Sequence, residues 1–303
     1  METRVIPFTD ESVAEAARLI LAGKPVAVPT ETVYGLAADA TNSKAVARIY
    51  RAKGRPAFNP LIVHVADLAA ALKIGEFSEA ALALARKHWP GPLTLVVPMR
   101  KGSAIASLVT AGLPSVGLRV PDHPAMQALL RASNRPLAAP SSNASGSISP
   151  TRAEHVLRSL RGRIPLVIDG GATTRGIEST IIASTGGKLR LLRRGPIEVE
   201  AEGETGSTIE APGQLASHYA PSKALRLNAT SAEEDEYLIG FGSVEGETNL
   251  SPSGELVEAA SRLFDLLHVA DTSDKVRIAI APLPNEGLGA AINDRLRRAA
   301  ADR

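Results

Sequence analysis

Strand-like and helix-like segments alternate along this chain as far as about residue 200, and this alternation constrains the fold more than any other feature. In the first unit, apolar residues recur at helical spacing over 13–20. Asp10 or Ser12 can cap this helix, and Gly23 can end it. An apolar strand over 25–28 follows at once. The same reading predicts further strands at 93–97, 116–120, 165–168, 180–183 and 189–192, and helices at 43–52, 78–88, 122–132 and 150–160. We therefore expect an α/β fold, a twisted open sheet of mixed direction flanked by helices.

A change in composition marks a domain boundary after this region. Between Glu198 and Pro221 the hydrophobic periodicity disappears, and Gly, Glu and Pro become frequent, which is typical of a linker. The alternation then resumes, with strands predicted at 224–227, 237–241 and 276–281, a helix announced by Ser251-Pro252, and a last helix over 289–300. The chain is thus divided into a large domain (1–199), a linker (200–222) and a small α/β domain (223–303).

Composition excludes several classes of function. The chain has 303 residues, a formal charge of +2, only 3% aromatic residues and no cysteine. The small charge implies no global attraction to nucleic acid or membrane, so anions must be bound by local clusters of Lys and Arg. The lack of cysteine excludes disulfides, thiolate nucleophiles and Cys-based metal sites, and it fits a cytoplasmic protein. The acidic N-terminal segment and the absence of a long apolar run lead us to expect no export signal and no membrane.

Standard catalytic patterns are missing as well. The sequence has no GxxxxGK[ST], no complete GxGxxG, no HExxH and no GxSxG. Its six histidines are scattered singly, so we expect no protein-held metal. The remaining hydroxyl, amide and guanidinium groups suit a site that binds an anionic substrate and stabilises charge without covalent attack.

The densest group of such side chains lies between Pro29 and His64. A polar loop, a helix and a Lys-Gly-Arg turn stand there between two short apolar strands, so the polar groups fall at strand ends. Lys53 supplies a point charge and Arg55 a bidentate fork, the two forms of cation that match phosphate oxygens. A solvated turn is the alternative for an isolated Lys-Gly-Arg triplet. Asn59-Pro60, which leads directly into the next strand, favours a functional site.

Five motifs carry a resemblance to a known family: PTETVYGLAADA, AKGRPAFNPLIVH, GLRVPDHP, APSSNASGSISPT and GIESTI. Their order resembles that of the YrdC-like ATP-dependent proteins over roughly residues 10–200. HYAP at 218–221 and the later NEGLGAAINDRLRRAA are similar to the longer two-domain branch, the threonylcarbamoyl-AMP synthases. The resemblance implies a YrdC-like catalytic domain, a Rossmann-like second domain, and synthesis of threonylcarbamoyl-adenylate from L-threonine, bicarbonate and ATP. Diphosphate would leave with Mg²⁺, and a partner enzyme would use the product to modify the adenosine beside the tRNA anticodon.

The same resemblance assigns roles to particular residues. It implies a catalytic contribution from Lys53 and Arg55. It implies L-threonine binding by Thr32, His64, Arg119, Ala139 and Ser179. It implies ATP binding by Arg55, Asn59, Ser115, Ser141, Asn143, Ser149, Arg193 and Tyr219, with the linker around Tyr219 acting as a lid that excludes water.

Several alternatives stay open on the sequence. Ser149 can cap a helix as well as bind phosphate, Ser141 and Asn143 can form a simple turn, and His64 can be a core histidine. Glu31 is a candidate to hold Mg²⁺ or water. A non-catalytic module that binds double-stranded RNA or tRNA, and an enzyme of carbamoyl transfer in metalloenzyme maturation, are the alternative functions, and direct tRNA binding is left undecided.

Overall fold

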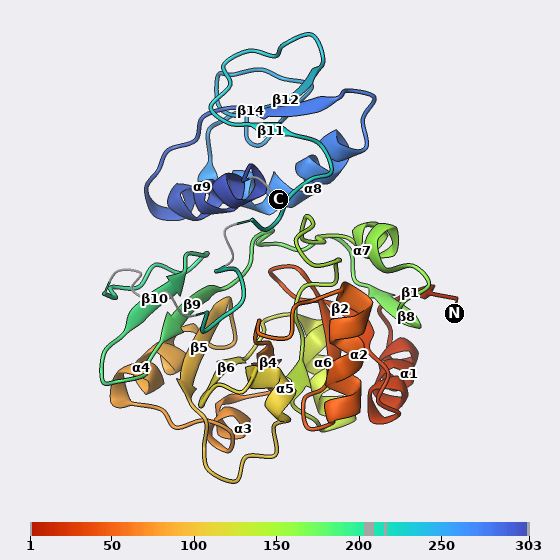
Figure 1. The fold of residues 1–303 in the computed structure, drawn as a ribbon, viewed down its shortest axis with the longest axis vertical. Coiled ribbons are helices and arrows are strands. Elements are labelled where there is room, and N and C mark those ends of the chain that lie inside the picture. The colour runs from red at the N-terminus through yellow and green to blue at the C-terminus, as the bar shows by residue number, and fades with distance from the viewer. Residues whose placement is uncertain (1, 203–208, 215–216, 302–303) are drawn as a thin grey trace.

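Two α/β domains lie one above the other in the computed structural model, which describes residues 2–202, 209–214 and 217–301 (Figure 1). The helices of the large domain are α1 (Asp10–Leu21), α2 (Ser43–Lys53), α3 (Leu68–Leu72), α4 (Glu79–His88), α5 (Ser107–Thr110), α6 (Pro124–Ser133) and α7 (Ala153–Leu160). Its strands are β1 (Arg4–Pro7), β2 (Val26–Pro29), β3 (Tyr34–Asp39), β4 (Ile62–His64), β5 (Leu93–Pro98), β6 (Ser115–Arg119), β7 (Leu137–Ala138), β8 (Leu166–Asp169), β9 (Thr180–Ala183) and β10 (Arg190–Arg193). The predicted α/β class is confirmed.

The strands of the large domain form one ten-stranded sheet of mixed direction, in the order β1-β8-β2-β3-β7-β4-β6-β5-β9-β10. Strands β4 and β6 are parallel neighbours, and their register pairs His64 with Arg119. Both residues end their strands, so two polar side chains leave the sheet at the same edge. An aliphatic core covers each face of the sheet, as expected for a chain with so few aromatic residues.

Three helix starts differ from the prediction. Thr9, not Asp10 or Ser12, is the N-cap of α1, because its hydroxyl accepts from the Ser12 amide while the Ser12 hydroxyl accepts from the Thr9 amide. Ser149 caps no helix, since α7 begins at Ala153. The start signal Ser251-Pro252 likewise precedes its helix by several residues. Asp10 and Ser12 already lie inside α1, whereas Ser149 and Ser251 lie in loops several residues before their helices begin.

The small domain has a four-stranded parallel sheet in the order β11-β14-β12-β13. Its elements are β11 (Leu225–Arg226), β12 (Glu236–Gly240), β13 (Thr248–Asn249), α8 (Leu256–Asp271), β14 (Arg277–Ile280) and α9 (Gly287–Ala299). Helices α8 and α9 lie between this sheet and the large domain (Figure 1). The core on this side includes Leu263, Phe264 and Ile292, together with Tyr219 from the linker and Ile177 from the large domain. One apolar cluster is therefore shared by both domains.

Polar and close backbone contacts complete the interface between the domains. Gly176 has φ +69°, and a Cβ there would lie 2.3 Å from the carbonyl oxygen of Ala260 in α8, so only glycine fits.

The rings of His155 in α7 and His268 in α8 stack with centroids 3.9 Å apart. Burial is the main cause that lowers the pKa of His155 to about 2 and that of His268 to about 4. Both imidazoles are therefore neutral at pH 7.

This stack predicts a loss of stability in mild acid. Between pH 7 and 5 the unfolded chain protonates these histidines near their ordinary pKa of about 6.5, whereas the folded chain keeps them neutral, so stability present at pH 7 is lost as the pH falls. In His155→Gln the drop in the free energy of unfolding between pH 7 and 5 should be smaller than in the original chain by roughly 1–2 kcal/mol. Urea unfolding at both pH values measures it, and an unchanged drop would contradict the assignment.

Candidate functional site

A buried pocket lies at the edge of the large sheet where β4 and β6 end. It is lined by Thr30, Thr32, Val33, Gly35, Arg55, Ile62, His64, Arg119, Ala139, Pro140, Ser141, Glu178, Ser179, Arg193, Pro212, His218 and Tyr219. Three guanidinium groups converge on it from separate elements, and the linker supplies Pro212, His218 and Tyr219. The pocket is thus cationic and is closed on one side by the segment that joins the domains.

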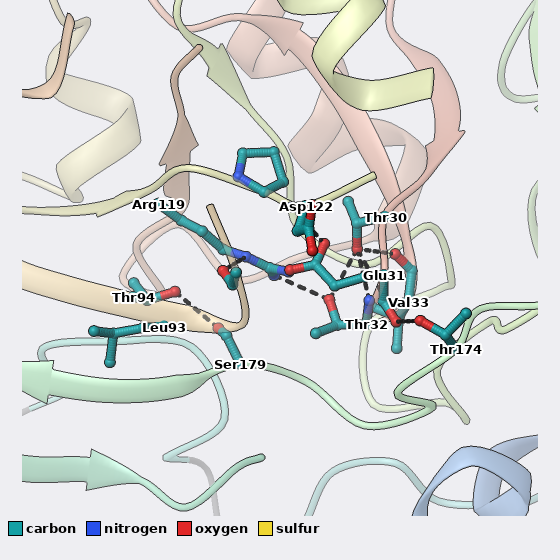
Figure 2. A network of polar contacts seen from close by, with 12 residues as sticks. Thr30, Glu31, Thr32, Val33, Leu93, Thr94, Arg119, Asp122, Thr174 and Ser179 are labelled. Atoms are coloured by element: carbon teal, nitrogen blue, oxygen red, sulfur yellow. Dashed lines mark hydrogen bonds and ion pairs between the residues drawn. The ribbon is translucent and has the colours of Figure 1, made fainter. Parts of the chain in front are cut away.

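Arg119 is held in place by the loop between β2 and β3 (Figure 2). Its Nη2 lies 2.5 Å from Glu31 Oε1, and its Nη1 donates to Thr32 Oγ1 at 2.9 Å. The other oxygen of Glu31 accepts from the Asp122 amide. Both members of the ion pair are buried, so each neutralises a charge that water cannot reach. Because both oxygens of Glu31 are engaged, the structure does not support Glu31 as a Mg²⁺ ligand.

Arg55 is positioned by its own turn. Its Nη2 donates to Asn59 Oδ1 at 2.6 Å and to the Pro60 carbonyl at 2.9 Å, and its Nε donates to the Asn59 carbonyl. Burial lowers the pKa of Arg55 to about 10, which still leaves it charged at pH 7. Asn59 itself does not line the pocket. The structure therefore gives Asn59 the role of orienting Arg55.

Arg193 ends β10 and lies beside Ser179. Its Nε donates to the Ser179 carbonyl and its Nη2 to Ser179 Oγ, both at 3.0 Å. Ser179 Oγ also lies 2.8 Å from Thr94 Oγ1 (Figure 2). Burial lowers the pKa of Arg193, and nearby cations lower it further. A buried, partly paired guanidinium of this kind attracts an anionic ligand strongly.

Lys53 occupies a different place from the one predicted. Its Nζ donates to the carbonyls of Ser141 and Asn143 at 2.6 and 2.5 Å, and it does not line the pocket. Burial lowers the pKa of Lys53 well below its usual range, and the nearby positive charge of Arg55 lowers it further. The ammonium group holds the 141–143 segment from behind, which places Ser141 at the pocket wall.

Other predicted residues fall outside the pocket lining. Asn143 turns its amide nitrogen to the carbonyls of Ala144 and Ser147, and Ser115 lies at the opposite end of β6 from Arg119. Ser149 donates to Glu178 Oε1, so its hydroxyl supports a wall residue and neither caps a helix nor faces the pocket. Nothing in the spacing of Ser115, Asn143 and Ser149 along the sequence indicates that they lie outside the pocket lining.

The remaining predicted residues do line the pocket: Thr32, His64, Ala139, Ser141 and Tyr219. Burial, and then the charge of Arg119, lower the pKa of His64 to about 3, so its ring is neutral. Tyr219 is buried with φ +64°, and within the described residues its hydroxyl has no hydrogen-bond partner. Its neighbours tie the linker down, since the His218 amide donates to the Arg298 carbonyl and the Ala220 amide to the Gly146 carbonyl.

Glu178 is a charged wall residue whose role the sequence does not predict. It belongs to the quoted motif GIESTI and stands directly before Ser179. Its carboxylate pairs with Arg295 of α9, at 3.1 Å from Nε. Arg295 belongs to the quoted motif NDRLRRAA, which contains three arginines. Nothing in the sequence indicates which of them turns inward.

The fold and the site define a class of two-domain α/β proteins with a cation-lined small-molecule pocket at the domain boundary. The family model described as "Telomere recombination" matches residues 18–195, and the one described as "Threonylcarbamoyl-AMP synthase, C-terminal domain" matches residues 173–301. The chain belongs to the threonylcarbamoyl-AMP synthase family of enzymes, which confirms the family predicted from the five motifs.

Individual relatives match along almost the whole chain. Threonylcarbamoyl-AMP synthase of Bacillus subtilis (strain 168) is 39% identical, covering 99% of this chain and 96% of the relative. That of Pyrococcus abyssi is also 39% identical, covering 94% and 92%. The crystal structure of P. abyssi Sua5 complexed with L-threonine superimposes with a TM-score of 0.89 at 35% identity, covering 99% of this chain and 97% of that one.

The buried ion pair of Arg119 with Glu31 predicts that a single substitution strongly lowers the free energy of unfolding. Glu31→Gln leaves the buried guanidinium without its counter-charge and should lower the free energy of unfolding by about 3–5 kcal/mol, measured by urea denaturation. Adding Arg119→Met to Glu31→Gln removes the uncompensated charge and should recover part of the loss. A single variant as stable as the original chain would show that the pair contributes little.

Proposed function

We propose that this pocket joins L-threonine, bicarbonate and ATP into L-threonylcarbamoyl-adenylate with release of diphosphate. The observation that carries the proposal is the convergence of Arg55, Arg119 and Arg193 on one buried pocket that also holds hydroxyl groups. The triphosphate of ATP and the carboxylate of threonine need such a cluster if both are to leave water together. The relative solved with L-threonine has the same two-domain fold.

Arg119 is the proposed clamp for the threonine carboxylate. A guanidinium has five N–H groups, and Arg119 uses one each for Gly91, Thr32 and Glu31. Two N–H groups, one on each Nη, are left for a carboxylate, the bidentate geometry that such pairs prefer. Thr32 and Ser179 supply hydroxyls for the polar ends of the amino acid, and neutral His64 packs beside it.

Arg55 and Arg193 are the proposed partners of the ATP phosphates, with Ser141 and Tyr219 beside them. Their charges lie where water is excluded, so they stabilise developing charge on the phosphate more than exposed arginines would. Lys53 contributes through the 141–143 backbone that it holds. Four residues are proposed to shape the nucleotide site indirectly: Asn59, Ser115, Asn143 and Ser149.

The reaction needs no protein nucleophile. Bicarbonate loses hydroxide to give carbon dioxide, the amine of threonine attacks its carbon to form a carbamate, and the amine proton leaves with that hydroxide as water. A carbamate oxygen then attacks the α-phosphorus of ATP while the bond to diphosphate breaks. A pKa of about 3 makes His64 a poor base, which favours a binding role for it. The linker residues Pro212, His218 and Tyr219 cover the pocket and protect the labile adenylate from water.

Mg²⁺ commonly accompanies ATP, whose phosphates supply several of its ligands together with one or two carboxylates. Within 2–202, 209–214 and 217–301, no group of three or more His, Asp or Glu side chains is placed to hold a metal ion.

The cellular context is also part of the proposal. The product would pass to a partner enzyme that modifies the adenosine next to the tRNA anticodon, in the cytoplasm. Among the described residues, no helix is long and apolar enough to cross a membrane. The division into a catalytic domain (1–199), a lid-forming linker (200–222) and a small domain (223–303) agrees with the two sheets.

Two arginine variants should separate the two substrates. Arg55→Ala should raise KM for ATP by about ten- to a hundredfold and lower kcat, with less effect on KM for threonine. Arg119→Ala should instead raise KM for threonine, with less effect on KM for ATP. Threonine- and bicarbonate-dependent diphosphate release measures both. Arg51→Ala, which removes an exposed arginine of α2, is the matched control and should behave like the original chain. Unchanged diphosphate release by Arg55→Ala would contradict the assignment.

A further inference from the structure

Arg295 is one of the largest fully buried side chains that the small domain contributes to the domain boundary. It lies on α9, is 0% exposed, and reaches the large domain. Its Nε donates to Glu178 Oε2 at 3.1 Å, its Nη2 to the Glu178 carbonyl at 3.4 Å, and its Nη1 to the Arg194 carbonyl at 2.5 Å. Nη1 also lies 3.3 Å from Asp294 Oδ2. One guanidinium therefore connects α9 with two segments of the pocket wall.

The carboxylate that Arg295 neutralises lies in that wall. Glu178 lines the pocket together with Arg193 and Tyr219, the side that we assign to ATP. Ser149 donates to its other oxygen, so both oxygens are held. A carboxylate without its counter-charge at this place would repel a triphosphate across a medium of low dielectric. The neutralising charge comes from the small domain, although the pocket belongs largely to the large one.

The same guanidinium also supports the lid residue. The Arg295 Cζ lies 5.6 Å from the ring centroid of Tyr219, on whose ring Phe264 of α8 packs at the same centroid distance. Burial by itself lowers the pKa of Arg295, but the neighbouring Tyr219, Glu178 and Asp294 outweigh it and raise the pKa above its usual value. These groups therefore stabilise the charged form of Arg295, which contacts Glu178 and the carbonyl oxygen of Arg194.

We propose that Arg295 is a positioning residue of the active site, through which the small domain neutralises Glu178 and fixes Glu178 and Tyr219 so that the pocket accepts the polyphosphate of ATP. This inference rests on the proposed function and deepens it. Arg295 acts through its neighbours and does not itself line the pocket. The small domain is thereby part of the nucleotide site.

Arg295→Met in the full chain tests this role, with Arg297→Met as the matched control on the exposed side of α9. Arg295→Met should weaken binding of a non-hydrolysable ATP analogue by about tenfold or more, and should raise KM for ATP more than KM for threonine. The control should match the original chain. An unchanged dissociation constant in Arg295→Met would overturn the proposal. The original chain is assayed first, because its failure to bind ATP would count against the proposed function itself.

A second substitution separates charge neutralisation from a purely structural role. Arg295→Met combined with Glu178→Gln removes the uncompensated carboxylate and should bind the analogue more tightly than Arg295→Met alone. Equal or weaker binding by the double variant would overturn the proposal, because a structural defect is not repaired by removing a second contact. If Arg295→Met does not fold, Arg295→Gln replaces it: its amide can still donate a hydrogen bond but carries no charge, so analogue binding as tight as in the original chain would overturn the proposal.

Discussion

The burial of positive charge at the edge of the large sheet is the constraint on which the site depends. Lys53, Arg55, Arg119 and Arg193 all lie out of contact with bulk water, and each loses hydration that the protein has to replace. Backbone carbonyls replace it for Lys53 and Arg55, and the Glu31 carboxylate does so for Arg119. The oxygens of the polar loops thus stabilise these cations at the ends of the strands and help to fix the positions of the loops.

The cations differ in how many of their N–H donors remain available to a ligand in the pocket. The ammonium of Lys53 is directed at two carbonyls behind the pocket, so its charge orders the wall. Arg119 and Arg193 are fixed by some of their N–H groups and present the pocket with the rest of the guanidinium, because a planar fork has donors on several sides. A rigid group with spare donors is what binding of carboxylate and phosphate requires. This difference explains why arginines predominate at the pocket.

The two domains share this electrostatic arrangement as well as an apolar cluster. The ion pair of Arg295 with Glu178 lies beside the apolar contacts of Tyr219 and Phe264, so separation of the domains would expose both at once. The neutral stack of His155 and His268 lies at another point of the same interface. Small domains of this size have a marginal core of their own, and attachment to the large domain adds to it. Docking and the shape of the pocket are therefore coupled.

The sequence by itself determined the α/β class, most of the longer helices and strands to within one to three residues, and the family, because hydrophobic periodicity and local motifs are properties of neighbouring residues. It did not indicate β3, which lies where a polar loop was expected. It also indicated the segment around Arg55 and the strand-end residues His64 and Arg119. Only the tertiary structure decided that Lys53 faces carbonyls, that Glu31 pairs with Arg119, and that Ser149 supports Glu178. It alone turned Arg295 inward and left Arg297 exposed. The physical reason is that the partners of these particular groups lie about 30 to 120 residues away in the chain, a distance over which no local pattern carries information. Arg55, by contrast, finds its partners within its own turn.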